Sequence, residues 1–254
     1  MQIRVFYLPI FTGMFFQFLA DYLKHRLRAK TRHGTHSPFV YRLVDEVIYD
    51  FSDKKVYKDI EQLRKKLLRD DVKFVRNLAK RTLSPRLGQL LYRLAKQHPA
   101  KKIIELGTYS GLTTSYLAKA NEQLSVLTIA DCSETVAVAL ENFALLGLTH
   151  IDLRVGNFNE LFLEELRMSP GLDFLFLSGN PTKEAILSYF NGCLPQVHEG
   201  SLVIIDDIYK SEGMKQAWKE IKAHPQVTVT IDLFWIGLVY FKKDQVKEHF
   251  KIRF

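Results

Sequence analysis

The sequence predicts an α/β fold in which helices cover a mostly parallel sheet and a helical extension precedes that sheet. Three observations support this prediction. Residues 1–98 show apolar residues at helical spacing only. From residue 100 onward, short apolar runs alternate with helical patterns, as they do in successive βα units. The last two apolar runs, near 227–232 and 236–241, are separated by too few residues for a parallel crossover, so they must pair as a hairpin.

The helical extension begins with an apolar run over residues 5–20, which a basic stretch follows. Pro9, Gly13 and Gln17 interrupt this run, and it is shorter than the roughly 20 residues that a membrane-spanning helix needs. Met14 opens a more regular helical pattern, and translation could begin there, which would leave residues 1–13 outside the native chain. The alternative is an amphipathic helix with basic flanks that lies on a membrane surface.

Further helices complete this first region. Ser37 and Pro38 predict a helix start, because serine caps helices and proline suits the first helical position. Apolar faces then recur within residues 40–48, 60–68 and 87–94. We therefore expect an N-terminal helical region over residues 1–98.

The second region, residues 99–254, alternates between strand and helix patterns. Strands are expected near 102–106, 125–130, 151–155, 173–178, 201–206, 227–232 and 236–241. Helices are expected near 112–120, 134–146, 160–167, 182–191 and 212–223. This alternation predicts one domain with a parallel sheet and helices on both of its faces.

A glycine turn follows the first strand of that domain. Residues 101–111 read KKIIELGTYSG, with Glu105 at the strand end and Gly107, Thr108, Ser110 and Gly111 in the turn. A strand, a glycine turn and a helix in succession bring the backbone close to a nucleotide-like ligand at the carboxyl edge of a sheet. The E-x-G-x-x-x-G spacing lacks the closely set glycines of NAD and FAD sites. A buried carboxylate such as Glu105 also needs a partner to offset its desolvation.

The next two strands also end in polar residues. Asp131 follows the second strand, where a carboxylate could accept hydrogen bonds from ribose hydroxyls; a helix N-cap is the alternative role. Gly156 and Asn157 end the third strand. Gly156 would let the backbone approach a ligand, and Asn157 could bond an adenine edge. A plain turn at the strand end is the other reading of this pair.

The segment KKIIELGTYSG resembles motif I of the class I S-adenosylmethionine-dependent methyltransferases, in the form of the catechol O-methyltransferase-like branch. HGTHSPFVYRL, residues 33–43, resembles the start of an uncharacterised group of methyltransferase-like proteins typical of Bacteroidetes. The resemblance covers residues 33–254. It implies a Rossmann-like, seven-stranded methyltransferase sheet whose last strand is antiparallel, and S-adenosylmethionine as the cofactor. The candidate cofactor contacts are Glu105, Gly107, Thr108, Ser110, Gly111, Asp131, Gly156, Asn157 and Ser178.

A divalent metal is not expected. In the catechol-type enzymes the fourth strand ends in an aspartate that binds the cation, and Ser178 occupies this position here. A neutral hydroxyl is a poor ligand for a hard dication. The related bacterial proteins have a histidine where this chain has Pro181. The resemblance places Asp206 at the second metal position, and Asp206 and Asp207 are the candidate catalytic residues.

The distribution of charge suggests a division of roles. Residues 1–100 hold 21 Lys and Arg against 9 Asp and Glu, a net charge of +12. Residues 101–254 hold 15 against 19, a net charge of −4. The basic region could contact an anionic membrane peripherally at its inner face, or it could be a solvated helical surface. Two cysteines without metal spacing suggest a reducing compartment, so we expect a cytoplasmic protein.

Three functions compete at this point. The first is metal-independent O-methylation of a small-molecule or lipid-like acceptor by S-adenosylmethionine. The second is a catalytically degenerate protein that binds S-adenosylmethionine without turnover. The third, a nucleic-acid methyltransferase, is disfavoured because its characteristic motifs are missing. A homodimer is a further expectation, and the sequence does not identify the methyl acceptor.

Overall fold

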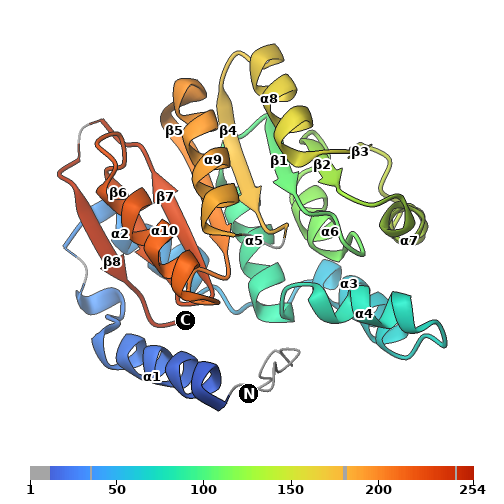
Figure 1. The fold of residues 1–254 in the computed structure, drawn as a ribbon, viewed down its shortest axis with the longest axis horizontal. Coiled ribbons are helices and arrows are strands. Elements are labelled where there is room, and N and C mark those ends of the chain that lie inside the picture. The colour runs from blue at the N-terminus through green and yellow to red at the C-terminus, as the bar shows by residue number, and fades with distance from the viewer. Residues whose placement is uncertain (1–11, 35, 180–181, 244) are drawn as a thin grey trace. The chain divides into compact units, whose positions relative to one another are not determined.

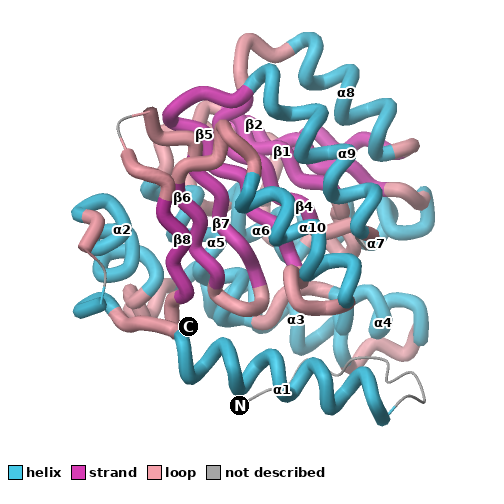
Figure 2. The backbone as a smooth tube through the Cα atoms, turned by 60° about the vertical axis from the view of Figure 1, so that its left-hand side comes forward, coloured by secondary structure: helices cyan, strands magenta, loops and turns pink. Residues whose placement is uncertain are grey.

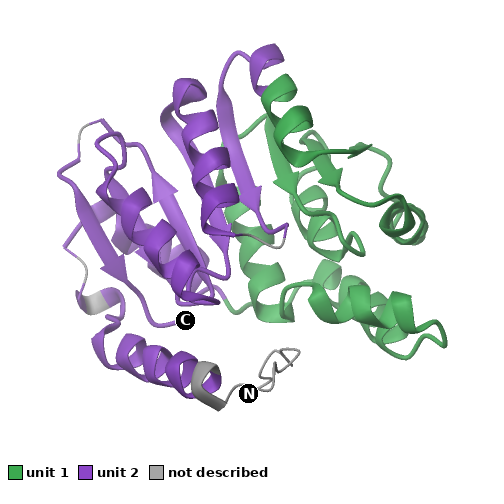
Figure 3. Cartoon of the chain, viewed as in Figure 1, with its two compact units in different colours: residues 1–5, 51–165 green, residues 6–50, 166–254 purple. Residues whose placement is uncertain are grey.

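The structure is a computed structural model, and it describes residues 12–34, 36–179, 182–243 and 245–254. The chain divides into two compact units, which Figure 3 colours separately. The first unit includes residues 51–165, and the second includes residues 12–50 together with 166–254. The expected boundary between residues 98 and 99 stays a prediction.

The first unit combines helices with three parallel strands (Figure 1). Its strands are β1 (Lys102–Leu106), β2 (Ser125–Ala130) and β3 (Ile151–Val155), hydrogen-bonded in the order β3-β2-β1. The helices are α3 (Lys55–Leu68), α4 (Lys73–Arg81), α5 (Pro85–Gln97), α6 (Leu112–Ala118) and α7 (Ser133–Leu145), and α8 (Phe158–Met168) follows β3. Helices α3 and α5 pack against α6. Ile103 and Val126 have no exposed surface, as expected for apolar runs in a parallel sheet.

The second unit contains five strands in the order β4-β5-β7-β6-β8. They are β4 (Leu172–Leu177), β5 (Val197–Asp206), β6 (Val229–Asp232), β7 (Ile236–Tyr240) and β8 (Glu248–Lys251). The helices are α1 (Thr12–Arg28), α2 (Pro38–Leu43), α9 (Lys183–Cys193) and α10 (Glu212–Ala223), with short turns η1 (Arg32–Gly34), η2 (Val44–Ile48) and η3 (Leu194–Gln196). Ser37 caps α2 by accepting a hydrogen bond from the amide of Val40, as predicted.

One expectation about the sheet requires correction. The described residues form eight strands rather than seven, because β8 pairs in parallel with β6. The hairpin of β6 and β7 is confirmed, and β7, the strand expected near 236–241, runs antiparallel to both β5 and β6 as predicted. Glu248–Lys251 escaped prediction because it is short and polar, and Phe250 is its one buried side chain.

Helix α1 presents apolar residues on two sides, whereas one apolar face was expected. Phe18 and Tyr22 contact Phe234, with ring centroids 5.2 Å and 5.1 Å apart. Leu23 and Leu27, on another side of the helix, are 53% and 85% exposed. No helix in the described parts of the chain has the length and hydrophobicity to cross a membrane.

Candidate functional site

Glu105 lies at the centre of the polar residues in the first unit. Its side chain has no exposed surface, and its Oε2 accepts hydrogen bonds from Thr114 Oγ1 at 2.5 Å and Thr128 Oγ1 at 2.7 Å. Thr108 Oγ1 lies 2.7 Å from Thr128 Oγ1, so Thr108 donates to Thr128 when Thr128 donates to the carboxylate. Burial raises the pKa of Glu105 to about 7, and the two hydroxyl groups oppose this rise.

Two buried polar atoms near the β1 turn have no hydrogen-bond partner among the described residues. They are Glu105 Oε1 and Ser110 Oγ, and both residues are fully buried. An unpaired buried polar atom costs about 1–3 kcal/mol, so such atoms are rare unless another molecule pairs with them. A carboxylate oxygen accepts hydrogen bonds, and a hydroxyl can donate or accept. This pair could therefore hold a ligand that carries an ammonium group and an oxygen acceptor.

The glycine turn has the positive-φ backbone that its sequence suggests. Gly107 has φ of 110° and Gly111 has φ of 74°, a region that glycine enters without steric cost. A Cβ at Gly111 would lie 2.6 Å from Phe143 Cε1. The amides of Gly107 and Thr108 donate to Ile129 O, and that of Gly111 donates to Thr108 O. These three amides already donate hydrogen bonds within the chain, so they are not donors for a ligand. The turn would instead let a ligand come close to the backbone.

Asp131 lies directly after β2 and is exposed. The N-cap of α7 is Cys132, and no side chain caps that helix end, so Asp131 does not take the alternative capping role. The thiol of Cys132 donates instead to Glu134 Oε2 at 2.5 Å. The Asp131 carboxylate can therefore accept hydrogen bonds from outside the chain, as its assignment to a ribose requires.

Gly156 and Asn157 form the turn after β3. Gly156 has φ of 156°, and its amide donates to Ala130 O at 2.9 Å. Asn157 Oδ1 accepts from the amides of Asn159 at 2.9 Å and Glu160 at 3.3 Å, so this oxygen caps α8. The pair therefore forms a turn at the strand end, which was the other expectation. Because the Asn157 oxygen is used in the cap, an adenine contact through this residue could use only its amide nitrogen. Sequence reasoning overlooked the cap, although an Asn followed three residues later by Glu is typical of one.

The second unit places three candidate residues at strand ends. Ser178 follows β4 and is 7% exposed, and Asp206 ends β5 and is 5% exposed. Asp206 Oδ1 accepts from the amide of Asp207 at 3.0 Å, and that amide also donates to Trp235 O at 2.7 Å. Asp207 has φ of 55°, and its Oδ2 lies 3.6 Å from Lys210 Nζ. Both acids therefore have partners within the chain.

Sequence reasoning missed a buried polar cluster in the second unit. Asp232 is 2% exposed; His25 Nε2 lies 3.0 Å from its Oδ1, and Tyr209 donates to its Oδ2 at 2.8 Å. Burial opposes ionisation of Asp232, but His25, the Phe234 amide and Tyr209 prevail and lower its pKa. No local signal could have found the cluster, since His25 and Asp232 are 207 positions apart.

The described residues contain no group of three or more His, Cys, Asp or Glu side chains that could hold a metal ion. Pro181, which stands where the related bacterial proteins have a histidine, lies outside the described residues. Metal independence stays a prediction, because Asp206 and Asp207 retain carboxylate oxygens that a cation could use.

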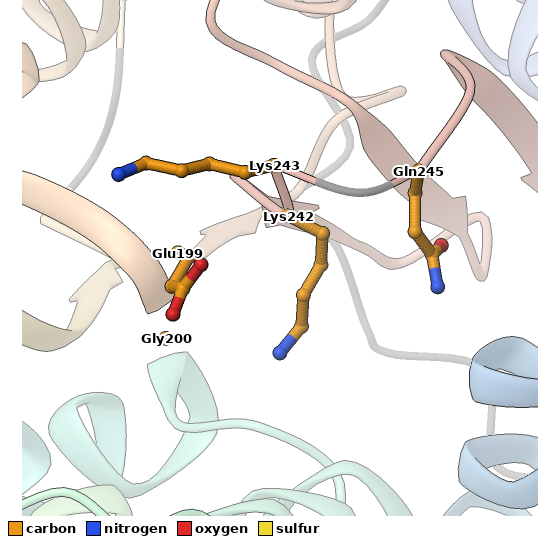
Figure 4. Close-up of a pocket in the computed structure, with 5 residues that line it drawn as sticks. All are labelled: Glu199, Gly200, Lys242, Lys243 and Gln245. Atoms are coloured by element: carbon orange, nitrogen blue, oxygen red, sulfur yellow. The ribbon is translucent and has the colours of Figure 1, made fainter.

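A hollow of about 350 Å³ lies in the second unit. Glu199, Gly200, Lys242, Lys243 and Gln245 line it (Figure 4). Glu199 and Gly200 are near the start of β5, whereas Asp206 is its last residue. We therefore do not assign the hollow to the chemistry of the strand ends.

Comparison with known proteins shows a similarity to methyltransferases. Residues 104–208 match a family model described as a methyltransferase domain. The catechol O-methyltransferase of Niastella koreensis is 28% identical over 132 residues, which are 51% of this chain and 59% of that protein's length.

Solved structures share the fold. An O-methyltransferase from Bacillus cereus in complex with SAH has a TM-score of 0.59 at 19% identity, over 76% of this chain and 93% of that one. A SAH-bound methyltransferase from Podospora anserina has a TM-score of 0.60 at 11% identity, over 94% and 100%. An O-methyltransferase from Streptomyces achromogenes in complex with SAM has a TM-score of 0.57 at 19% identity, over 80% and 95%. The chain thus has the Rossmann-like fold of these methyltransferases, and residues 104–208 match a methyltransferase domain.

Proposed function

We propose that the chain is an S-adenosylmethionine-dependent methyltransferase that methylates an oxygen of a small-molecule or lipid-like acceptor without a divalent metal. One observation carries the proposal. Within the matched domain, Glu105 at the end of β1 is a fully buried carboxylate with one oxygen that has no hydrogen-bond partner among the described residues. A fold with no ligand to bind has no reason to keep such a group.

The residues of the first unit fit the proposed cofactor. Glu105 Oε1 and Ser110 Oγ would hold its amino-acid end, because one accepts from an ammonium group and the other can donate to a carboxylate. The exposed carboxylate of Asp131 would accept from the ribose hydroxyls, and Gly156 with the amide nitrogen of Asn157 would border the base. When bound, S-adenosylmethionine supplies a methyl group activated by a positively charged sulfur.

The acceptor would use residues of the second unit. An acceptor hydroxyl must lose a proton as it is methylated, and Asp206 or Asp207 would receive it as a general base. Ser178 offers a neutral hydroxyl where the catechol-type enzymes have a metal-binding carboxylate, which supports chemistry without a cation. Most of the acceleration would then come from positioning the acceptor oxygen in line with the methyl group.

A second candidate is a protein that binds S-adenosylmethionine and has lost turnover. The partners of the two acids favour it: Asp206 accepts the Asp207 amide, and Asp207 lies near Lys210. In that case the acids stabilise the turn between β5 and α10 and do no chemistry.

Titration calorimetry with S-adenosylmethionine and S-adenosylhomocysteine tests the proposal. We expect micromolar binding to the full chain and a loss of about 10- to 100-fold in Glu105→Gln, which removes one charge-assisted hydrogen bond. Glu122→Gln is the matched control, because it makes the same change at an exposed turn. Equal binding by all three proteins would reject the assigned site.

Transfer of a labelled methyl group to a panel of catechols, phenols and amphiphilic alcohols then separates the two candidates. Transfer to any member supports the enzyme, whereas binding without transfer to any of them favours the degenerate protein. A location in the cytoplasm and a homodimer remain predictions beside this proposal.

A further inference from the structure

Helix α1 is fixed to the second unit through one of its sides. The rings of Phe18 and Tyr22 pack against Phe234 and also against Trp235, at centroid distances of 5.7 Å and 6.2 Å from the latter. In Figures 1 and 2 the helix lies beside the C-terminal end of the chain. Aromatic contacts of this kind add to the free energy gained from burying the rings.

Polar contacts prevent this helix from turning about its axis. His25 is 3% exposed and pairs with Asp232, while Lys215 Nζ lies 2.7 Å from Asp21 Oδ2. Lys30, just after the helix, forms a parallel bridge with Ile252. Rotation would leave buried polar groups without hydrogen-bond partners. The side of α1 opposite to these contacts therefore faces outward.

The outward side of α1 carries an apolar stripe. Phe16, Leu19, Leu23 and Leu27 are 66%, 40%, 53% and 85% exposed. Steps of three and four residues place them in one row along the helix. A single exposed leucine is ordinary, but a row of four large side chains is typical of a surface that binds something.

The charges beside the stripe indicate what it binds. Lys24, Arg28 and Lys30 are exposed, and Asp21, which is the acid of this helix, is occupied by Lys215. The stripe is therefore flanked by cations without a free acid on the helix. Two copies that met through this surface would bring like charges together, whereas an anionic bilayer offers both an apolar interior and negative headgroups.

We propose that α1 lies in the plane of an anionic phospholipid bilayer, with Phe16, Leu19, Leu23 and Leu27 inserted and Lys24, Arg28 and Lys30 among the headgroups. None of the helices in the described ranges can span a membrane, so the contact is a peripheral one at the surface. The apolar stripe gives depth of insertion, and the cations give selectivity for anionic lipid.

The position of α1 also indicates the acceptor class. Trp235, which contacts Phe18 and Tyr22, accepts through its carbonyl oxygen from the amide of Asp207 at 2.7 Å. The membrane-facing helix therefore adjoins the strand end that carries the candidate base, all within the second unit. A lipid-like acceptor that reaches the protein from the bilayer surface follows from this arrangement. This acceptor class rests on the proposed function.

Vesicle flotation with the full chain tests the proposal. The probes are vesicles of phosphatidylcholine alone and vesicles containing phosphatidylglycerol at one part in three. We expect binding to the anionic vesicles only, with a fall of about tenfold or more in Leu23→Gln/Leu27→Gln, since two leucines leave the bilayer. Lys24→Gln/Arg28→Gln should lose about fivefold for each charge. Lys65→Gln/Lys66→Gln on α3 removes two exposed cations elsewhere and should bind as the wild type does.

Three outcomes would overturn the proposal. The first is no flotation at low salt, and the second is equal flotation of the α1 variants and the wild type. The third is a dimer that does not bind vesicles and that the two leucine changes dissociate. Calorimetry with S-adenosylhomocysteine on the same variants keeps the two proposals apart. The two α1 variants should bind it as the wild type does, because their changes lie outside the first unit. If the chain fails to float with vesicles but binds S-adenosylhomocysteine, the membrane proposal is rejected and the proposed function is not.

Discussion

The two units treat the polar residues at their strand ends differently. In the first unit, Glu105 and Ser110 each keep a buried polar atom that no described group satisfies. In the second unit, Asp206 accepts the amide of Asp207, and Asp207 has Lys210 within 3.6 Å. A buried polar atom without a partner gains from pairing with a ligand or a water molecule, whereas groups that already have partners also hold the local backbone.

This difference has a consequence for cofactor binding and for catalysis. Glu105 Oε1 and Ser110 Oγ would gain from a hydrogen-bond partner, because an unpaired buried polar atom is costly. Asp206 and Asp207 already have partners within the chain. Variants in one unit at a time should therefore affect cofactor binding and methyl transfer separately.

The largest effect should come from Gly111→Ala. The new Cβ would lie 2.6 Å from Phe143 Cε1 on a backbone with φ of 74°. Left-handed strain of about 1–2 kcal/mol and overpacking of about 1–3 kcal/mol together predict a loss of about 2–5 kcal/mol in the free energy of unfolding.

Gly147→Ala is the matched control for Gly111→Ala, because Gly147 has φ of 65° and no atom within 4 Å of the new Cβ. It should lose only the strain part, which thermal unfolding of both variants would measure. Equal losses would mean that Phe143 moves aside without cost and that the turn is less rigid than it looks.

The second effect concerns the pH dependence of Glu105. Its folded pKa of about 7 exceeds the ordinary 4.5, so the folded state binds the proton more tightly than the unfolded state does. The stability that this provides is complete below pH 4.5 and is lost as pH rises through 7, in total about 3 kcal/mol. Glu105→Gln should abolish this slope.

Cofactor affinity should follow the opposite trend in the wild type. An ionised Glu105 is needed to accept from an ammonium group, so affinity for S-adenosylhomocysteine should fall up to tenfold per pH unit below about 7 and level off above it. Calorimetry between pH 5.5 and 8 checks this for the wild type and for Glu105→Gln, which should show a flat profile. A flat profile in the wild type would place the ligand away from this carboxylate.

The third effect separates binding from chemistry. Asp206→Asn and Asp207→Asn should leave affinity for S-adenosylhomocysteine within about twofold, because the acids already have partners within the chain. Methyl transfer to a responsive acceptor should fall about 100-fold in whichever variant removes the base. Asp173→Asn, which alters a partly exposed pair with His198, should change neither quantity. An unchanged transfer rate in both acid variants would assign the two aspartates to structure alone.

The smallest effect should come from a chelator. If Ser178 leaves the second unit without a metal site, then EDTA should change cofactor affinity and methyl transfer by less than about twofold. A tenfold loss that Mg²⁺ restores would show that Asp206 and Asp207 suffice to hold a cation. The same titration on Asp206→Asn would then identify the ligand.

The sequence could predict much of the fold, because parallel strands are continuous apolar runs that turns separate clearly. Strands β1, β2 and β3 begin and end where the periodicity placed them. Strand β8 escaped because four mostly polar residues carry no pattern, and pairing with β6 defines the strand. The two apolar sides of α1 were likewise inseparable, since the choice between Phe18 and Leu23 for burial depends on Phe234, which is distant in sequence.

The sequence predicted the backbone conformation of the candidate site better than it predicted the hydrogen bonds of its side chains. The positive φ of Gly107 and Gly111 follows from their place in a strand-to-helix turn. Thr114 and Thr128, which donate to Glu105, were missed, although threonines inside apolar patterns are a signal that a polar partner is buried nearby. The ligand assignments of Asp131 and Asn157 stay predictions, because they depend on a second molecule.

The contacts of α1 have a consequence for synthesis of the chain. His25 meets Asp232 across 207 positions, and the carbonyl oxygen of Arg26 accepts from Arg253 across 227. At about 5–20 residues per second, α1 leaves the ribosome roughly 10–40 s before these partners exist. During that interval both of its apolar sides are uncovered on the nascent chain, and the side with Phe18 and Tyr22 is covered only when the last strands fold. Folding of β6, β7 and β8 therefore decides when the side of α1 with Phe18 and Tyr22 is protected from aggregation.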